Sequence, residues 1–244
     1  MNVLTIDIGG THVKVLVSAE KESRKFPSGP TMTPQIMVAG VGRLTTDWTF
    51  EAISVGYPGP VLHNRPVAEP HNLAKGWTTF DYRRAFRCPL KFMNDAAMQA
   101  LGSYRGGKLL FLGLGTGLGT AMIVDGIVEP MELAHLPYKR ATYEDYIGLR
   151  GLKKHGREKW QKHVADVVQQ LVAALGPDDI VLGGGNLRLL NKLPSGCRAG
   201  DNANAFLGGF RLWTDGSARS RVPPRVTQRA RARAARPPRR VMVR

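Results

Sequence analysis

Short apolar runs, each bounded by glycine, proline or polar residues, recur through the first hundred residues. Runs of this kind predict β-strands, here Asn2–Ile8, Val13–Ala19, Ala52–Tyr57 and Leu90–Met93. The first two runs meet at Gly9-Gly10, which predicts a hairpin. Ala96–Tyr104 is rich in Ala, Met, Gln and Leu and predicts a helix. The first part of the chain is therefore expected to be a mixed α/β unit.

The same order of hairpin, helix and strand follows a second time. Further strands are predicted at Lys108–Leu114, Thr120–Val124, Ile127–Val128 and Asp179–Leu182, and helices at Tyr143–His155, Glu158–Leu175 and Asn202–Leu212. This repetition predicts two similar α/β lobes, residues 1–105 and 106–200. A helix within residues 201–216 is expected to pack back on the first lobe.

Positive charge is concentrated at the C-terminal end. The 244 residues carry a net charge of +16, and residues 211–244 hold eleven arginines against one acid, Asp215. Residues 217–244 contain mainly Arg, Ala, Pro and Val without a sustained apolar stripe, which predicts a basic, largely disordered tail. Such a tail could contact nucleic acid through phosphates. It could also be a plain extension or a reading-frame artefact, and a specific nucleic-acid function is disfavoured.

Cysteine content and the lack of long apolar segments indicate the cellular compartment. The two cysteines, Cys88 and Cys197, have no C-x-x-C spacing, which disfavours a disulfide framework or a cysteine-rich zinc site. No apolar run approaches the roughly 20 residues that cross a bilayer. The N-terminus lacks the basic and apolar regions of a signal peptide. These features predict a cytoplasmic protein with no membrane association.

A first candidate site lies between the first two strands, in the segment Asp7–Lys14. Adjacent Gly9 and Gly10 permit a close backbone approach, so that successive N–H groups can face phosphate oxygens. Thr11 adds a hydroxyl donor and Lys14 a cation, while Asp7 could hold Mg²⁺ through water. The alternative is an ordinary hairpin turn with a solvated aspartate.

A second candidate phosphate loop is Gly113–Thr120, with four glycines at alternate positions between two apolar strands. Glycine weakens a strand, so this density requires a reason, and contact with phosphate through Gly115, Thr116 and Gly117 is the favoured one. A tight glycine hairpin is the alternative. A dinucleotide-binding fingerprint fits poorly because a strand, and not a helix, follows the loop. Gly184, in a further glycine loop, is equally compatible with phosphate binding and with a strand-to-helix turn.

Asn94-Asp95 follows a strand and precedes a helix. A carboxylate at this position can accept the proton of an attacking hydroxyl while phosphoryl transfer depends mainly on positioning and charge neutralisation. The alternative for Asp95 is a helix N-cap, but a cap alone would not require the Asn-Asp pair.

Taken together, these segments resemble the ROK family of sugar kinases and regulators, in the sugar kinase/hsp70/actin superfamily. The resemblance spans roughly residues 3–210 and rests on Asp7–Lys14, on Asn94-Asp95-Ala96 followed by Ala100-Leu101-Gly102, and on Gly113–Thr120 followed by Asp125-Gly126. The short length and Gly56–Pro60 are most similar to the glucokinase branch that includes polyphosphate glucokinases. The resemblance implies an α/β fold of the two-lobed, actin-like (ribonuclease H-like) ATPase type with a central cleft.

The resemblance also implies roles for individual residues. Asp95 would be the general base toward the 6-hydroxyl of glucose, and the phosphoryl donor would be ATP or inorganic polyphosphate with Mg²⁺. Glu132 and His135 match an acid-x-x-His element, Glu144 a second acid, and Asn72 a sugar-lobe asparagine. The implied sugar-binding set is Asn72, Asn94, Asp95, Glu132, His135 and Glu144. Without the resemblance, the preferred interpretation of Glu132 and Glu144 would be surface acids, that of His135 a core histidine, and that of Asn72 a loop asparagine.

The chain also departs from the family pattern. Many ROK proteins have a cysteine-rich zinc element after the histidine, whereas Leu136–Thr142 contains no cysteine, so no structural zinc is expected. Ser103-Tyr104 stands where many members have glutamate, which weakens the fine placement of the site. Basic residues that could follow a polyphosphate chain, or simply face solvent, are Lys139, Arg140, Arg150, Lys153 and Lys154.

Other classes of function remain possible at this point. A kinase for another hexose is one, and a non-catalytic sugar sensor or nucleic-acid-binding regulator is another, since part of the family are repressors. Those repressors carry an N-terminal helix-turn-helix domain, for which a motif starting at residue 7 leaves no room. Many family members form dimers, so a homodimer is a further expectation of the resemblance.

Overall fold

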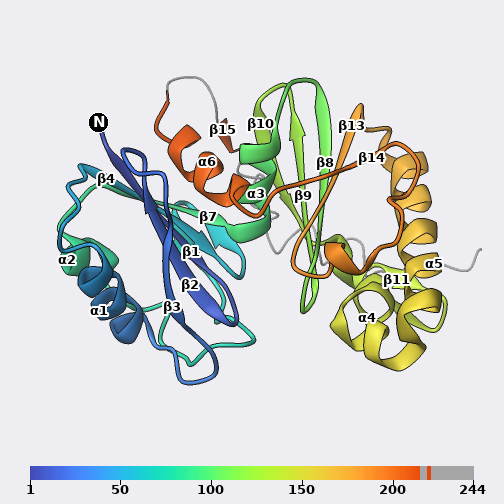
Figure 1. Ribbon diagram of the computed structural model, residues 1–244, viewed down its shortest axis with the longest axis horizontal. Helices are drawn as coiled ribbons and strands as arrows, with labels where there is room; N and C mark the ends of the chain where they lie inside the picture. Colours follow the sequence, from blue (N-terminus) through green and yellow to red (C-terminus); the bar gives the residue numbers. More distant parts are fainter. Residues whose placement is uncertain (215–218, 221–244) are drawn as a thin grey trace, which may run out of the picture.

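The computed structural model describes residues 1–214 and 219–220. Apart from residues 219–220, which form the short strand β15 (Arg219–Ser220), the predicted tail lies outside the described residues. Two β-sheets contain most of the described strands, with helices between and around them (Figure 1). No helix among the described residues is long and apolar enough to cross a bilayer.

The first sheet has the order β3-β2-β1-β4-β7, with β3 at Arg24–Pro27, β2 at His12–Val17, β1 at Val3–Ile8, β4 at Ala52–Tyr57 and β7 at Leu90–Asn94. Strands β1 and β2 form an antiparallel hairpin, and β4 and β7 continue the sheet in parallel with β1. Every residue of β1 and β4 is buried, as expected for parallel strands covered on both faces.

Helices cover both faces of the first sheet. On one face lies α1 (Pro34–Leu44), which Thr33 caps and which buries Met37 and Val41. On the other lies α6 (Asn204–Arg211), which returns from the end of the chain to pack on β1 and β4 (Figure 1). Ser54 of β4 is fully buried, and its hydroxyl donates to the carbonyl of Gly209 at 2.6 Å. A polar residue in the sheet therefore fixes the position of this helix.

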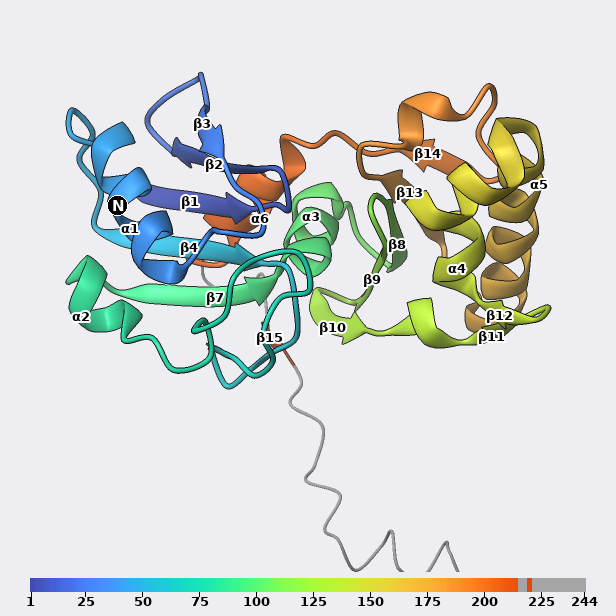
Figure 2. The same ribbon diagram turned by 90° about the horizontal axis from the view of Figure 1, so that it is seen from below.

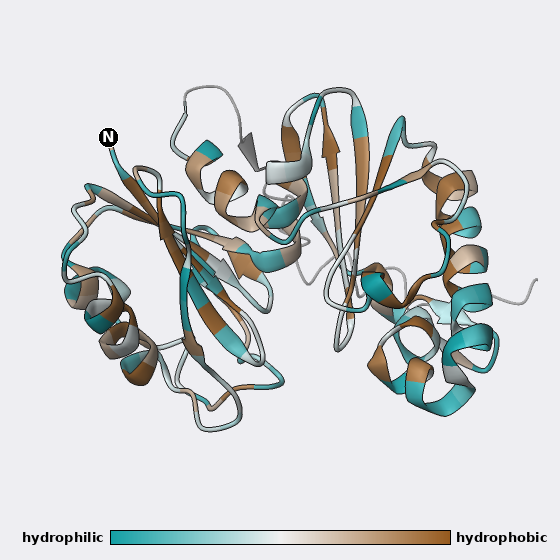
Figure 3. Cartoon of the chain, in the orientation of Figure 1, coloured by the Kyte–Doolittle hydropathy of each residue, from teal (hydrophilic) through white to brown (hydrophobic). Residues whose placement is uncertain are grey.

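The second sheet has the order β14-β13-β8-β9-β10-β15, with β14 at Cys197–Ala199, β13 at Asp179–Gly183, β8 at Lys108–Leu114, β9 at Leu118–Val124 and β10 at Ile127–Met131. Strand β8 is apolar on both faces for a clear reason. Leu109 and Phe111 face α3 (Asp95–Ser103), while Leu110 and Leu112 face α5 (Leu149–Leu175). Figure 3 shows this concentration of apolar residues on the strands and polar residues on the outer side of α5.

Helix α3 lies between the two sheets, next to α6 (Figure 2). The two helices approach closely because both have glycine at the contact. A Cβ on Gly102 would overlap the carbonyl of Asn204, and one on Gly208 would overlap the carbonyl of Met98. This contact fixes α3, whose first residue is Asp95, relative to both sheets.

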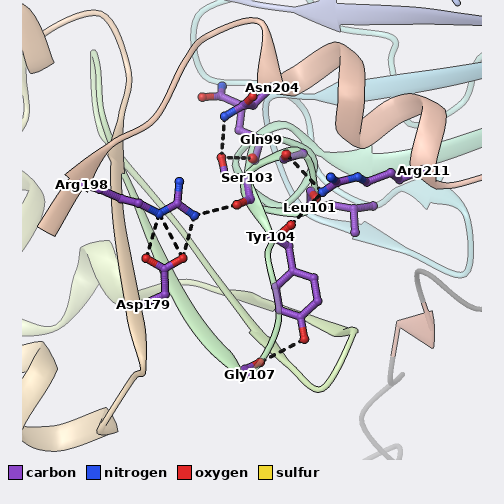
Figure 4. A network of polar contacts seen from close by, with 10 residues as sticks. Gln99, Leu101, Ser103, Tyr104, Gly107, Asp179, Arg198, Asn204 and Arg211 are labelled. Carbon is purple, nitrogen blue, oxygen red and sulfur yellow. Dashed lines mark hydrogen bonds and ion pairs between the residues drawn. The ribbon is translucent and has the colours of Figure 1, made fainter.

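Arginines hold the C-terminal end of α3 (Figure 4). Arg211 donates to the carbonyls of Leu101 and Tyr104 at 2.6 and 3.0 Å. Arg198 of β14 donates to the carbonyl of Ser103 at 2.7 Å and pairs with Asp179 at 2.6 Å. Cations suit this end of a helix because its last carbonyls lack helical partners. The second sheet is thereby tied to the helix that carries Asp95.

The predicted helix Tyr143–His155 is wrong as one piece. Helix α4 spans Tyr143–Ile147 and ends where Gly148 becomes extended, and α5 then begins at Leu149. A second break occurs within α5 at Gly156, which has φ 73° and ψ 163°. Glycine permits both breaks. The remaining short elements are β5 (Val61–Leu62), β6 (Arg65–Pro66), α2 (Tyr82–Phe86), η1 (Leu133–His135), β11 (Pro137–Tyr138), β12 (Ala141–Thr142) and η2 (Leu187–Leu189).

Candidate active site

Asp95 is the first residue of α3, directly after β7. Asn94, and not Asp95, is the N-cap, since its side-chain oxygen accepts the N–H of Ala97 at 3.1 Å. The amide nitrogen of Asn94 donates to the carbonyl of Gly59 at 3.2 Å. Asp95 accepts the N–H of Ala96 at 2.8 Å, and no cation pairs with it among the described residues. The capping role therefore belongs to the neighbour, and the Asp95 carboxylate is not neutralised.

The surroundings of Asp95 disfavour its charged form. Burial raises the pKa of its carboxyl from 3.8 to about 7, and the negative charges of Asp7 and Glu132 add to the rise. The hydrogen bond from the N–H of Ala96 lowers the pKa and partly offsets this rise. A carboxyl with this pKa is about half ionised at neutral pH, the range in which general bases work best. Two other predicted site residues, Asp7 and Glu132, therefore influence the charge of Asp95.

Asp7 is the last polar residue of the buried strand β1, and only 8% of its surface is exposed. Burial raises the pKa of its carboxyl, and Lys14, whose ammonium lies 3.8 Å away, opposes the rise. The pair arises from the hairpin register, which places Asp7 opposite Lys14 on β2.

The loop Gly9–Thr11 is anchored through its carbonyls. The Ser28 hydroxyl donates to the carbonyl of Gly9 at 2.6 Å, and the Ser28 N–H donates to the carbonyl of Thr11 at 2.9 Å. Within the described residues, the N–H groups of Gly10 and Thr11 make no hydrogen bond. Exposed N–H groups on a glycine turn can bind an anion. Asn72 is exposed beside this loop, and a Cβ on Gly10 would lie 3.6 Å from its Cβ.

The glycine loop between β8 and β9 has the same organisation. The carbonyl of Leu114 accepts the N–H of Asn186 at 2.9 Å, and that of Thr116 accepts the N–H of Leu149 at 3.1 Å. The carbonyl of Gly115 accepts the side-chain amide of Asn186 at 2.8 Å. In the part of the chain that the structure describes, the N–H groups of Thr116 and Gly117 are without a partner. Each loop therefore has two neighbouring N–H groups without a partner among the described residues, while most of the carbonyls around them accept hydrogen bonds.

Gly184 lies behind this second loop. Its φ is 86°, and a Cβ there would overlap the backbone of Leu114. Glycine is therefore required for close packing of the loop that follows β13 against the end of β8. Asn186, two residues later, makes the two hydrogen bonds that fix the glycine loop, a role that its sequence context did not reveal.

Asp95 and the second loop are in contact through their neighbours. A Cβ on Gly119 of β9 would lie only 2.8 Å from the Cβ of Ala96, so the strand packs directly on the first turn of α3. Asp95, the candidate base, is therefore the residue just before Ala96, which contacts β9 where this strand leaves the glycine loop.

Glu132 and His135 lie on the turn after β10, both well exposed, with 4.0 Å between the carboxylate and the imidazole. Thr120 holds this turn, because its hydroxyl donates to the carbonyl of Met131 at 2.6 Å and accepts the N–H of Leu133 at 3.2 Å. Thr120 is a second positioning residue that the sequence did not single out.

Glu144 lies on α4, which packs against the turn that carries this exposed pair. Its carboxylate accepts the N–H of Leu118 at 3.2 Å, and a Cβ on Gly117 would overlap its Oε2 atom. The structure therefore places Glu144 against the glycine loop.

The basic residues proposed as a polyphosphate track have different surroundings. Arg150 pairs with Asp145 at 2.8 Å. The Lys139 ammonium lies 5.2 Å from the ring centre of Tyr138 and 3.3 Å from Nδ1 of His163. Lys153, Lys154 and Arg140 are exposed. Among the described residues, only part of the track is therefore without intramolecular partners.

The protein has two β-sheets on either side of a shared helix, and each sheet has a glycine loop at its first hairpin. This is the actin-like ATPase fold, as the solved structural relatives confirm. Residues 3–129 match the ROK family, and the chain belongs to that family. The family and the fold class inferred from the sequence are both confirmed.

The chain is also similar to individual sugar kinases of this family. The polyphosphate glucokinase of Mycobacterium tuberculosis is 26% identical over 209 residues, which cover 77% of this chain and 78% of that protein. The solved inorganic polyphosphate/ATP-glucomannokinase of Arthrobacter sp. strain KM superposes with a TM-score of 0.73 at 22% identity, over 85% of this chain and 96% of the other. A glucokinase of Streptomyces griseus, solved with glucose and AMPPNP, has a TM-score of 0.65 at 17% identity, over 85% and 97%.

Proposed function

We propose that the protein is a sugar kinase that transfers a phosphoryl group from ATP or inorganic polyphosphate to the 6-hydroxyl of glucose. The observation that carries the proposal is the Asp95 carboxyl, which has no cationic partner among the described residues and a pKa raised by burial to about 7. It is adjacent to a strand that leaves a loop with free N–H groups. The names of the relatives support a sugar kinase and suggest glucose.

In the proposed reaction, Asp95 accepts the proton of the 6-hydroxyl as the sugar oxygen forms its bond to the transferred phosphorus. The bond between that phosphorus and the donor oxygen breaks, and the donor leaves one phosphate shorter. The N–H groups of Gly10 and Thr11, and those of Thr116 and Gly117, would hold donor phosphates, with Lys14 as a nearby cation. Proton removal and phosphate positioning then come from different elements of the fold.

Mg²⁺ fits the acids of this site. Asp7 is buried, and its charge acts unfavourably on Asp95. A hard oxygen ligand of this kind can hold Mg²⁺ through water. When bound, the ion would neutralise charge on the donor phosphates. No cluster of three or more metal-ligating side chains occurs in residues 1–214, which agrees with an ion held mainly by water and substrate.

We propose Asn72, Asn94, Glu132 and His135 as the residues that bind the sugar hydroxyls, and Glu144 as a further contact. Glu132 and His135 are exposed and 4.0 Å apart, and the charge of Glu132 helps to raise the pKa of Asp95. Carboxylate, amide and imidazole groups accept and donate hydrogen bonds in fixed directions, which suits recognition of hydroxyls.

The donor and the sugar are tested by direct assay. Purified protein is given glucose with ATP and, separately, glucose with polyphosphate, and then mannose and fructose with whichever donor is used. The proposal expects glucose 6-phosphate with at least one donor. A protein that binds glucose but forms no sugar phosphate with either donor would instead be a sensor, and the proposal would be refuted.

The role of Asp95 is tested by substitution. Asp95→Asn is expected to lower kcat by on the order of 10³ while glucose binding stays within about tenfold, because the amide cannot accept the proton. Asp125→Asn is the matched control: Asp125 is exposed on the β9–β10 turn at φ 50°, a conformation that asparagine tolerates. Turnover of Asp95→Asn near the wild-type rate would exclude Asp95 as the base.

A further inference from the structure

Glu144 occupies an unexpected position for a residue grouped with the sugar ligands. It is the second residue of α4, which a Thr142–Asp145 capping box fixes at its start. Its Oε2 atom accepts the N–H of Leu118 at 3.2 Å and rests where a side chain on Gly117 would be. A negative charge is therefore seated on the loop that is proposed to hold the donor phosphates.

This position matters because a carboxylate and a phosphate compete for the same kind of partner. The N–H groups of Thr116 and Gly117 are free, and the next one along the chain, that of Leu118, is taken by Glu144. A phosphate that approached the free groups would meet an anion on the neighbouring residue, and no cation among the described residues pairs with Glu144 to offset its charge. Like charges at such short range repel strongly in a partly buried setting.

The backbone around Glu144 is held by hydrogen bonds that do not involve its carboxylate. The carbonyl of Glu144 accepts the N–H of Gly148 at 2.8 Å, and the next residue, Leu149, donates to Thr116 of the loop at 3.1 Å. These bonds tie α4 to the glycine loop whichever way the carboxylate points. A side-chain rotation alone could therefore remove the charge from the loop.

We propose that Glu144 is a charge gate on the donor loop. In the sugar-free protein its carboxylate holds the Leu118 N–H and opposes binding of donor phosphates. Sugar hydroxyls compete for the carboxylate and draw it away, so that the sugar strengthens donor binding. By linkage, the donor then strengthens sugar binding by the same factor. The gate rests on the proposed function and adds to it a reason why donor would not be hydrolysed without an acceptor.

The test uses binding rather than turnover. Isothermal titration measures the Kd of inorganic tripolyphosphate with Mg²⁺, and of AMPPNP with Mg²⁺, without and with saturating glucose. For the wild type, glucose is expected to lower the Kd of the donor probe at least fivefold. Glu144→Gln keeps an oxygen that can accept the Leu118 N–H but removes the charge. It is expected to bind the probe at least fivefold more tightly than wild type without glucose, with less than a twofold further effect of glucose.

Two further variants make the comparison decisive. Glu158→Gln on the exposed side of α5 removes the same charge away from the loop and is expected to behave as wild type. Glu144→Ala removes both charge and hydrogen bond, and it should also bind the probe more tightly than wild type without glucose. Thermal melting checks that each variant is folded.

The gate is refuted if both Glu144 variants are folded and bind the probe no more tightly than wild type without glucose, or if glucose still strengthens binding fivefold in Glu144→Gln. Failure of the proposed function looks different: wild-type protein would neither bind glucose nor form a sugar phosphate. In that event the glucose-free comparison of Glu144→Gln with wild type still decides whether the carboxylate opposes anion binding at this loop.

Discussion

Replacing the proposed base should make the protein more stable while abolishing its activity. In Asp95→Asn the amide keeps the shape of the side chain and can still accept the N–H of Ala96, which Asp95 accepts at 2.8 Å. It cannot ionise. The variant therefore removes the unfavourable ionised form of a half-buried carboxyl that has Asp7 and Glu132 as neighbours of the same charge.

The magnitude follows from the pKa. Burial raises the pKa of Asp95 from 3.8 to about 7, so the folded state binds the proton more tightly than the unfolded state. The stability that this proton contributes is complete below pH 3.8 and is lost as the pH rises through about 7. Between pH 5 and pH 8 the free energy of unfolding of the wild type should fall by about 2.5 kcal/mol through this one group.

The assay is urea unfolding, followed by tryptophan fluorescence, at pH 5 and pH 8 in the presence of EDTA. Asp95→Asn should exceed wild type in stability by about 2.5 kcal/mol more at pH 8 than at pH 5. Asp125→Asn is again the control and should show no such difference. If the advantage of Asp95→Asn were the same at both pH values, or if the variant were less stable than wild type at pH 8, the carboxyl would not be held in an unfavourable charged state.

Two further predictions concern turnover. For the wild type, kcat/KM for glucose should fall about tenfold per pH unit below pH 7, because Asp95, with its pKa raised by burial to about 7, must be ionised to act as base; a flat profile between pH 5 and 7 would contradict this. Asn186→Ala removes the hydrogen bond to the carbonyl of Gly115, at 2.8 Å, and should cost about 1 kcal/mol of stability. It should also raise the KM of the donor more than the KM of glucose. An equal rise in both KM values would show that Asn186 does not act through the donor loop.

The sequence predicted the strands and turns of this site well because their signals are local. An apolar run, a glycine pair and a strand-to-helix step can each be recognised within ten residues, and β1, β4, β8 and α3 lie where they were expected. Helix α1 and strands β3 and β14 were not predicted, since their apolar patterns are short or mixed. The break at Gly148 was missed because helix propensity is summed over a window and the glycine lies inside a long helical pattern.

The residues that position the site were not predictable in the same way. Asn186 acts on a loop 71 residues earlier, and Arg198 acts on Ser103, 95 residues earlier. Such contacts depend on which strands become neighbours, here β13 beside β8 and β14 beside β13. Glu144 was grouped with sugar ligands by resemblance, and its hydrogen bond to the glycine loop is likewise a result of tertiary packing.

The four glycines of the second loop have four different surroundings, and this refines the reading of the whole motif. A Cβ on Gly113 would lie 3.3 Å from the ring of Phe111, one on Gly117 would overlap Glu144, and one on Gly119 would lie 2.8 Å from Ala96. A Cβ on Gly115 would have no described atom within 4 Å. Three of the glycines are thus explained by packing within the protein. Packing among the described residues does not explain the lack of a side chain at Gly115, which supports the proposal that a donor phosphate approaches the N–H groups of Thr116 and Gly117 that follow it.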